Sequence, residues 1–143
     1  MPEALPDYRN LDVSGEAETA AARMEARAQE PASAAMFDAM IRPLLDEKVV
    51  DVLDIGCGTA SLARRIAAEL PSARVRAVDK SDTMLKVAAR LAKAEGVSRI
   101  DMQTWDVTDE GAFPYLPGRF DLIVSSVMTI YLEDGEVADL VAR

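Results

Sequence analysis

The fold of this chain is decided by the stretch Val49-Val50-Asp51-Val52-Leu53-Asp54-Ile55-Gly56-Cys57-Gly58-Thr59-Ala60. Five of the seven residues from Val49 to Ile55 are valine, leucine or isoleucine, which is typical of a strand covered on both faces of a parallel sheet. Gly56 and Gly58 then permit a sharp turn and let a ligand approach the backbone closely. Because the next helix directs its free N–H groups at this turn, the stretch predicts a site for an acidic or dipolar ligand group.

Length and composition indicate a single globular domain. The chain has 143 residues, a formal net charge of −9, one cysteine and no histidine. The acidic balance disfavours nucleic acid as a partner, and no apolar run approaches the roughly 18 residues that a membrane span needs. We therefore expect a soluble protein, and because Met1–Asp7 do not read as a secretory signal we expect it in the cytoplasm. A single cysteine cannot form an internal disulfide, which agrees with a reducing compartment. Without histidine, His-based metal sites are excluded and we expect no metal.

The N-terminal part divides the chain at about residue 31. Residues 1–31 are predicted to form an arm followed by a helix over Glu16–Gln29, which Pro31 ends. Residues 32–143 are predicted to form the ligand-binding domain. This domain opens with a second helix from Ala32, in which Pro43 introduces a kink or an end. The apolar positions that recur at helical spacing, and are expected to face the core, are Ala35, Met36, Ala39, Met40, Leu44 and Leu45.

Strands and helices alternate after the glycine turn. Further strands are predicted over Arg74–Val78, Arg99–Trp105 and Phe120–Val127, with a final helix from Glu133 onward. A helix carrying Leu62, Ile66 and Leu70 ends at Pro71, and another is capped by Ser81 or Asp82, carries Met84, Leu85, Ala88 and Leu91, and ends at Gly96. Right-handed crossovers then give an α/β, Rossmann-like open parallel sheet of order 3-2-1-4 with helices on both faces and an N-terminal helical extension.

Several polar residues follow the strands of this sheet and should share one pocket. In such sheets the ligand lies outside the carboxyl ends of the strands, where Gly56, Asp79, Asp106 and Ser125 fall. Asp54, two residues before the first glycine, can accept a hydrogen bond from an ammonium group. Asp79, 21 residues after Gly58, can accept both hydroxyl groups of a ribose.

The two motifs around the first and fourth strands resemble those of class I S-adenosylmethionine-dependent methyltransferases that act on small molecules, as in ubiquinone and menaquinone biosynthesis. The resemblance covers about Met36 to Leu140 and is carried by Val52-Leu53-Asp54-Ile55-Gly56-Cys57-Gly58-Thr59 and Phe120-Asp121-Leu122-Ile123-Val124-Ser125-Ser126. It implies S-adenosylmethionine as cofactor and methyl transfer to a small-molecule acceptor. It also implies that Asp106 and the N–H of Val107 contact the adenine edge.

The resemblance completes the set of expected cofactor-binding residues, which are Asp54, Gly56, Cys57, Gly58, Asp79, Lys80, Met84, Asp106, Val107 and Ser125. Met84 is expected to lie against the adenine. Family members usually carry a third glycine where this chain has Ala60, whose methyl group either crowds the methionine moiety or is accommodated by a small shift. Cys57 is expected to serve through its small size and backbone N–H.

Each acidic residue also has a purely structural interpretation. Asp54 could be a helix-dipole partner, Asp79 a turn and cap residue, and Asp106 part of a polar turn. No catalytic residue is assigned, because methyl transfer mainly requires alignment of acceptor and methyl group. Tyr131 is the nearest candidate for a substrate-facing group, with packing as its alternative role, and Tyr8 could close over the cofactor.

The end of the chain bears on its function. Members of the resembled family continue with three more strands, so we expect a partial domain whose fourth strand is an exposed edge open to self-association. Two other functions stay open. One is a nicotinamide-dinucleotide-binding oxidoreductase fragment, although this chain has Ser61 where the sequence motif of that class has a third glycine. The other is a non-catalytic interaction module that retains the fold.

Overall fold

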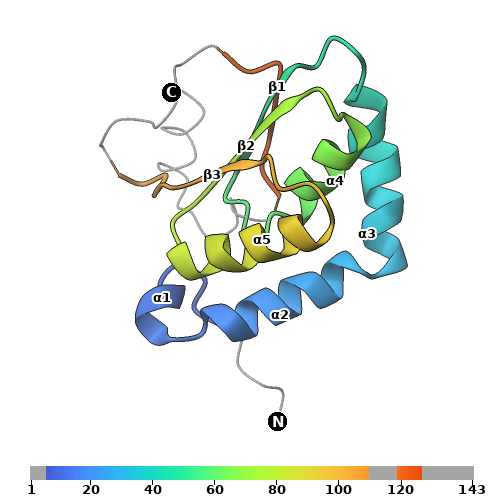
Figure 1. The fold of residues 1–143 in the computed structure, drawn as a ribbon. Helices are drawn as coiled ribbons and strands as arrows, with labels where there is room; N and C mark the ends of the chain where they lie inside the picture. Colours follow the sequence, from blue (N-terminus) through green and yellow to red (C-terminus); the bar gives the residue numbers. More distant parts are fainter. Residues whose placement is uncertain (1–5, 110–118, 127–143) are drawn as a thin grey trace.

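Four parallel strands form the centre of the molecule. The computed structural model of the chain describes residues 6–109 and 119–126. Their strands are β1 (Asp51–Ile55), β2 (Arg74–Asp79), β3 (Asp101–Thr104) and β4 (Leu122–Val124). They lie in the order β3-β2-β1-β4 (Figure 1). The predicted order and parallel direction are therefore confirmed.

The central and outer strands differ in burial. In β1 every residue after Asp51 is buried, as the apolar run predicts. The prediction of a buried strand over Phe120–Val127 is wrong in extent, because β4 has three residues and its Ile123 is 57% exposed. β4 pairs with β1 through Val52, Leu53 and Asp54, and β1 occupies the middle of the sheet. The central position of β1 explains its burial on both faces.

Helices α4 (Ser61–Glu69) and α5 (Asp82–Ala94) connect the strands. The hydroxyl of Ser81 accepts a hydrogen bond from the N–H of Met84 at 3.1 Å, so Ser81 is the N-cap of α5. The helix is followed by Gly96 at φ +75°, the left-handed conformation expected of a C-terminal glycine. Both predicted ends of α5 are confirmed, as is the end of α4 before Pro71.

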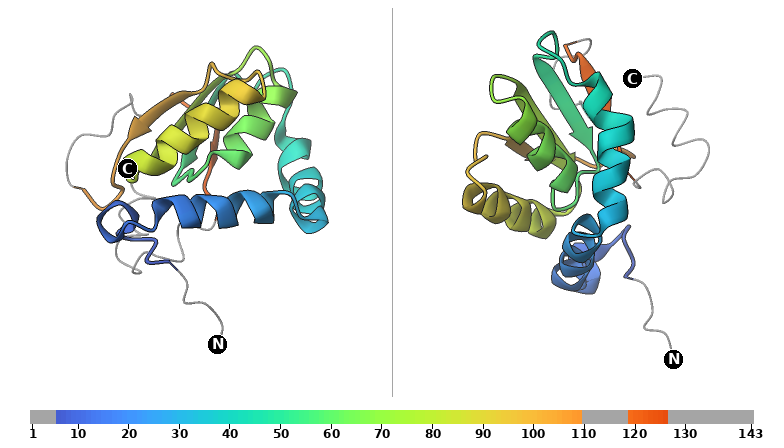
Figure 2. Two further views of the ribbon diagram at one scale, coloured as in Figure 1. Left: turned by 60° about the horizontal axis from the view of Figure 1, so that its bottom comes forward. Right: turned by 90° about the vertical axis from the view of Figure 1, so that its right-hand side faces the viewer.

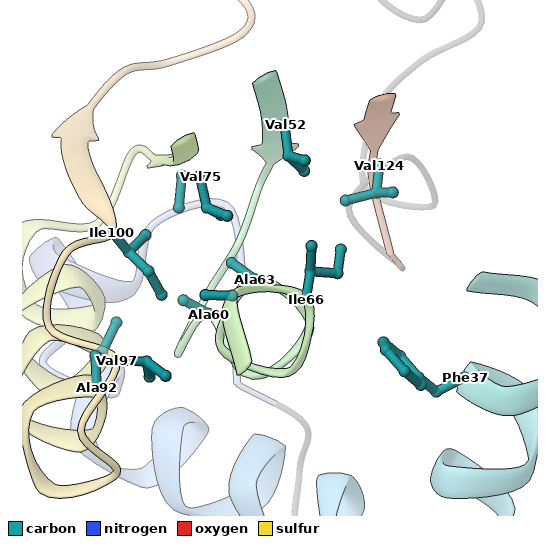
Figure 3. Close-up of a cluster of buried hydrophobic side chains, with 13 residues drawn as sticks. Phe37, Val52, Ala60, Ala63, Ile66, Val75, Ala92, Val97, Ile100 and Val124 are labelled. Atoms are coloured by element: carbon teal, nitrogen blue, oxygen red, sulfur yellow. The ribbon is translucent and has the colours of Figure 1, made fainter. Parts of the chain in front are cut away.

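The main core lies between one face of the sheet and the helices (Figure 3). Figure 3 shows Val52, Val75 and Val124 on three strands facing Ala63 and Ile66 of α4, with Phe37 approaching from the side. The ring of Phe37 also lies beneath two guanidinium groups, with its centroid 5.4 Å from Cζ of Arg42 and 5.8 Å from Cζ of Arg65. Much of this core is alanine and valine, so the helices pack close to the strands.

The N-terminal extension packs onto the domain. It contains α1 (Leu11–Ser14) and α2 (Ala17–Ala28), so the helix predicted over Glu16–Gln29 is confirmed within one residue at each end. A second apolar cluster joins these helices to α5, and it consists of Leu11, Ala17, Ala20, Ala21, Met84 and Val87. In Figures 1 and 2, α2 runs beneath the sheet, close to α5.

The segment before β1 is helical from Pro31 and ends just after Pro43, as predicted, but it changes helix type along its length. It forms α3 (Pro31–Met36), a π-helical turn at Phe37–Ile41 and a 3₁₀ turn at Arg42–Leu44 that contains Pro43. The expectation that Met36, Met40 and Leu44 face the core is wrong, because they are 58%, 64% and 51% exposed. Ala35 and Ala39 are exposed as well, whereas Leu45 is partly buried against the main core cluster. The segment itself carries apolar side chains on several sides. Of these, the large side chain of Phe37 is buried in the core.

A third apolar cluster covers part of the sheet through Leu53, Ile55, Val78 and Trp105, with Val107 and Phe120 packed against it. The predicted helix from Glu133, and with it Tyr131, lies outside the described residues. Among the residues that the structure describes, no helix has the length and apolar character required to cross a lipid bilayer.

Candidate cofactor site

Three left-handed residues shape the turn after β1. Gly56, Gly58 and Ala60 have φ values of +66°, +56° and +58°. The turn is held to the neighbouring strand, because the N–H of Cys57 donates to the carbonyl of Val78 at 3.0 Å. A left-handed conformation at alternate positions explains why glycine recurs in this motif, since other L-residues are strained there by about 1–2 kcal/mol.

Ala60 adopts the same conformation although it has a side chain. It precedes the first residue of α4, is fully buried, and belongs to the main core cluster (Figure 3). Its methyl group therefore packs against apolar side chains. Of the two alternatives from the sequence, this placement favours accommodation over crowding of a ligand.

Asp79 ties the end of β2 to the glycine turn. Its Oδ2 accepts a hydrogen bond from the N–H of Gly58 at 2.8 Å, and its Oδ1 accepts one from the N–H of Ser81 at 2.9 Å. Burial raises the pKa of Asp79, and these two N–H groups oppose the rise. Since a carboxylate offers about four acceptor positions, two remain for donors of a ligand.

Asp54 is a buried carboxylate without a conventional partner. Its side chain is 1% exposed, and neither oxygen has a hydrogen bond of normal geometry from the described residues. Burial raises the pKa of Asp54 to about 7; the Ala63 N–H in the first turn of α4 lowers this pKa, and the charge of Asp79 raises it further. Its position beside α4 is compatible with the helix-dipole interpretation, whereas the missing partners fit a donor such as an ammonium group.

Asp106 follows β3 and closes a local turn. Its Oδ1 accepts hydrogen bonds from the N–H and the hydroxyl of Thr108 at 2.9 and 2.7 Å. Partial burial opposes the effect, but these hydrogen bonds lower the pKa of Asp106. Its other oxygen lies 3.7 Å from Nζ of Lys80, which joins the loops after β2 and β3. The polar-turn interpretation is thus realised, and the partly exposed carboxylate can still accept a hydrogen bond from an adenine amine beside Lys80.

The remaining predicted residues are placed differently from one another. Ser125 directly follows Val124, the partner of Asp54 in the sheet register, and is exposed at the same edge. Val107 is partly buried against the third apolar cluster. Met84 has no exposed surface, since α1 and α2 cover it. Burial raises the pKa of Cys57 well above its usual range, so its thiol is not activated.

The sequence did not indicate three residues that lie against this turn. Met24 of α2 sits over Gly58, because a Cβ built on Gly58 would lie 2.7 Å from its Sδ. Glu25 accepts a hydrogen bond from the hydroxyl of Thr59 at 2.6 Å, and it also pairs with Arg64, which is 4% exposed. A buried arginine on the apolar face of a helix is the one signal that could have indicated an acidic partner.

The arrangement suits a ligand with a positive end and hydroxyl groups. Asp54 and Asp79 provide two carboxylates near the turn, and the missing side chain of Gly58 leaves backbone that a ligand can approach. The residues therefore fit S-adenosylmethionine, which has an ammonium group and a ribose, provided that Met24 moves from Gly58.

Comparison with solved structures identifies the fold of the chain. A solved structure from Methanococcus maripaludis, assigned to the S-adenosylmethionine-dependent methyltransferases, superposes with a TM-score of 0.72. It is 22% identical and the match covers 99% of this chain and 60% of that one. The architecture is thus the Rossmann-like fold of these methyltransferases.

Sequence relatives point to the same class. The release factor glutamine methyltransferase of Chlorobaculum tepidum is 40% identical over 90 residues, covering 62% of this chain and 30% of the relative. The malonyl-[acyl-carrier protein] O-methyltransferase of Hahella chejuensis is 34% identical over 84 residues, covering 59% of this chain and 28% of the relative. The chain therefore spans somewhat under a third of the length of these relatives.

The family model described as "Methyltransferase domain" matches residues 52–143. The chain belongs to this methyltransferase domain family. Membership favours the methyl donor over the nicotinamide dinucleotide of the alternative hypothesis.

Proposed function

We propose that this chain is the cofactor-binding portion of an S-adenosylmethionine-dependent methyltransferase that acts on a small-molecule acceptor. The observation that carries the proposal is the buried carboxylate of Asp54, which has no conventional hydrogen-bond partner among residues 6–109 and 119–126, beside a turn with three left-handed residues. When bound, S-adenosylmethionine would supply a sulfonium methyl group that bonds to an aligned nucleophile as the S–CH3 bond breaks and S-adenosylhomocysteine leaves.

The residues of the chain then have binding and orienting roles. Asp54 accepts from the ammonium group, and the two free acceptor positions of Asp79 take the ribose hydroxyls. Gly58 permits close approach, while Asp106 and Val107 face the adenine edge, with Lys80 oriented by Asp106. Ser125, directly after β4, borders the cofactor at the same edge of the sheet. Alignment of this kind is worth several kcal/mol of a methyl-transfer barrier without a catalytic base.

Calorimetric titration with S-adenosylhomocysteine tests the cofactor assignment. Asp79→Asn should weaken binding by at least about tenfold, the scale of a charge-assisted hydrogen bond of about 1.5–3 kcal/mol. Asp101→Asn is the matched control, because Asp101 is an exposed aspartate at the start of β3, and it should change affinity by less than about twofold. Absence of binding at millimolar concentration, or heat release with a nicotinamide dinucleotide instead, would refute the proposal.

The acceptor class needs its own experiment, because the named relatives are methyltransferases for a release factor and for an acyl-carrier-protein ester. Incubation with radiolabelled S-adenosylmethionine and a cell extract should place label in the small-molecule fraction. Label confined to protein bands would contradict the small-molecule assignment and leave the cofactor assignment intact.

Three broader assignments accompany this function. Residues 1–31 form a cover on the methyltransferase domain of residues 32–143, an assignment that the cluster joining α1, α2 and α5 supports. The protein acts in the cytoplasm, where a lone cysteine stays reduced.

The edge of β4, with Ile123 57% exposed, pairs with a second copy. Sedimentation of the wild type and of Ile123→Lys tests the last point, since the substitution should shift a dimer toward monomer.

A further inference from the structure

Helix α2 lies directly on the turn where the cofactor is expected. Met24 fills the space over Gly58, with Sδ and Cε at 2.7 and 3.3 Å from the position of an ideal Cβ. The thioether therefore occupies the space that the missing side chain of Gly58 opens. A ligand that approaches the backbone at Gly58 therefore competes with the Met24 side chain for the same volume.

A charged cluster holds α2 in this position. One oxygen of Glu25 accepts from the hydroxyl of Thr59 at 2.6 Å and from the guanidinium of Arg64 at 2.5 Å. Arg64 also donates to the carbonyl of Thr59 at 3.2 Å and to the carboxylate of Glu95 after α5. The cluster thus connects α2 both to the glycine turn and to the end of α5.

The cluster is poorly suited to a purely stabilising role. Arg64 is 4% exposed, and the desolvation of a buried charge offsets much of the attraction to its partners. Such pairs are instead well suited to fixing one arrangement among alternatives, because removal of a partner strongly disfavours it. Here the arrangement that is fixed is the one with Met24 on Gly58.

We propose that Glu25, Thr59 and Arg64 form a latch that holds α2 closed over the glycine turn, so that the cofactor binds only after α2 moves away. The inference rests on the proposed cofactor site. Its quantitative consequence follows from competition: when the open form is a fraction of the molecules, the apparent dissociation constant is the intrinsic constant divided by that fraction.

One small cavity among the described residues is lined by the N-terminal segment that precedes α2. A cavity of about 180 Å³ lies between residues 8–13 and the pair Lys80 and Ser81. Ligand pockets usually measure about 300–1,000 Å³. Residues 8–13, which precede α2 and include part of α1, line one wall of this cavity, so movement of this N-terminal segment would enlarge it.

The first test compares cofactor affinity among three variants. Glu25→Gln removes the charge of the latch with little change in shape, and Met24→Ala removes the side chain over Gly58. Each should bind S-adenosylhomocysteine at least about threefold more tightly than the wild type. Glu18→Gln, the same change at an exposed position of α2, should leave the affinity unaltered. Unchanged or weaker binding by Glu25→Gln would overturn the latch, because α2 would then complete the pocket.

A second measurement does not depend on the cofactor. Hydrogen exchange followed by mass spectrometry should show faster exchange of the amides of α2 in Glu25→Gln, with α5 unchanged and Glu18→Gln like the wild type. Equal exchange of α2 in Glu25→Gln and wild type would overturn the latch. If the wild type and all variants fail to bind S-adenosylhomocysteine, the proposed function falls, and hydrogen exchange still decides whether Glu25 holds α2 closed.

Discussion

The two halves of the ligand-binding edge are built differently. At the ends of β1 and β2, Asp54 is almost fully buried and Asp79 accepts two backbone hydrogen bonds that fix the glycine turn. At the ends of β3 and β4, Asp106 bonds within its own exposed turn and Ser125 faces solvent. The β1–β2 half is therefore organised before any ligand binds, whereas the β3–β4 half has side chains that a ligand must orient.

The largest expected effect concerns the ionisation of Asp54. The pKa of Asp54 is about 7 in the fold, against an ordinary value of about 3.9 in the unfolded chain. Between about pH 4 and 7 the folded state holds the extra proton, so the free energy of unfolding falls as pH rises, by up to about 4 kcal/mol. The raised pKa of Asp79 acts in the same direction.

Asp54→Asn should remove most of this pH dependence. At pH 8 it should raise the free energy of unfolding by about 2 kcal/mol, because the gain of about 4 kcal/mol from removing the buried charge is reduced by about 2 kcal/mol for burying the amide. Urea denaturation at pH 4.5, 6 and 8 measures the effect. Asp101→Asn should keep the wild-type slope, since Asp101 is exposed. A wild-type stability that does not fall from pH 4.5 to 8 would show that the β1–β2 half carries no buried charge.

Gly58→Ala should lower the free energy of unfolding by about 2–3 kcal/mol. A left-handed alanine is strained by about 1–2 kcal/mol, and the new methyl group would overlap Met24. Gly96→Ala is the control, because Gly96 has φ +75° and, chain neighbours aside, no atom of the described part of the chain lies within 4 Å of a built Cβ, so this change isolates the strain. Thermal unfolding of both variants, and of Gly58→Ala with Met24→Ala, separates overlap from strain. Equal losses at the two glycines would refute the overlap.

Asp106→Ala should have a smaller effect, about 0.5–1 kcal/mol on stability, because the hydrogen bonds to Thr108 lie in an exposed turn and the contact with Lys80 spans 3.7 Å. Cofactor affinity should fall by less than about fivefold when measured by calorimetry beside Asp79→Asn. A loss as large as that of Asp79→Asn would mean that both halves of the edge bind equally strongly.

Ser125→Ala should change stability by less than about 0.5 kcal/mol, as is usual at exposed positions. Cofactor affinity measured by calorimetry should fall by less than about twofold, because water can replace the single hydroxyl of an exposed serine. A large shift in melting temperature would place Ser125 in the folded core of the edge instead.

The features predicted well from the sequence are those set by short-range backbone requirements. The strand–glycine–helix stretch, the Ser81 cap and Gly96 each reflect a local need for a particular dihedral angle or hydrogen bond. The strand order followed from right-handed crossovers between parallel strands. These features could be predicted without knowledge of side-chain packing.

The features that were missed depend on contacts between distant segments. Helical spacing placed Met36 and Met40 in the core, but spacing alone cannot show that Phe37 fills that place. The contact of Met24 with Gly58 joins residues 34 positions apart, and the partners of Arg64 come from α2 and from the residue after α5. Such pairings leave no local pattern, so the covering of the candidate site by α2 could only be seen in three dimensions.

Ala60 has a consequence for how this chain tolerates sequence change. The position combines a backbone that favours glycine with a packed apolar environment that rewards a small methyl group. Alanine gains about 1 kcal/mol from burial of its methyl group, and glycine gains about 1 kcal/mol from the absence of dihedral strain. The two residues should therefore give nearly equal stability at this position. In a saturation library, both residues should survive selection for folding at this site, while every bulkier or branched alternative is depleted.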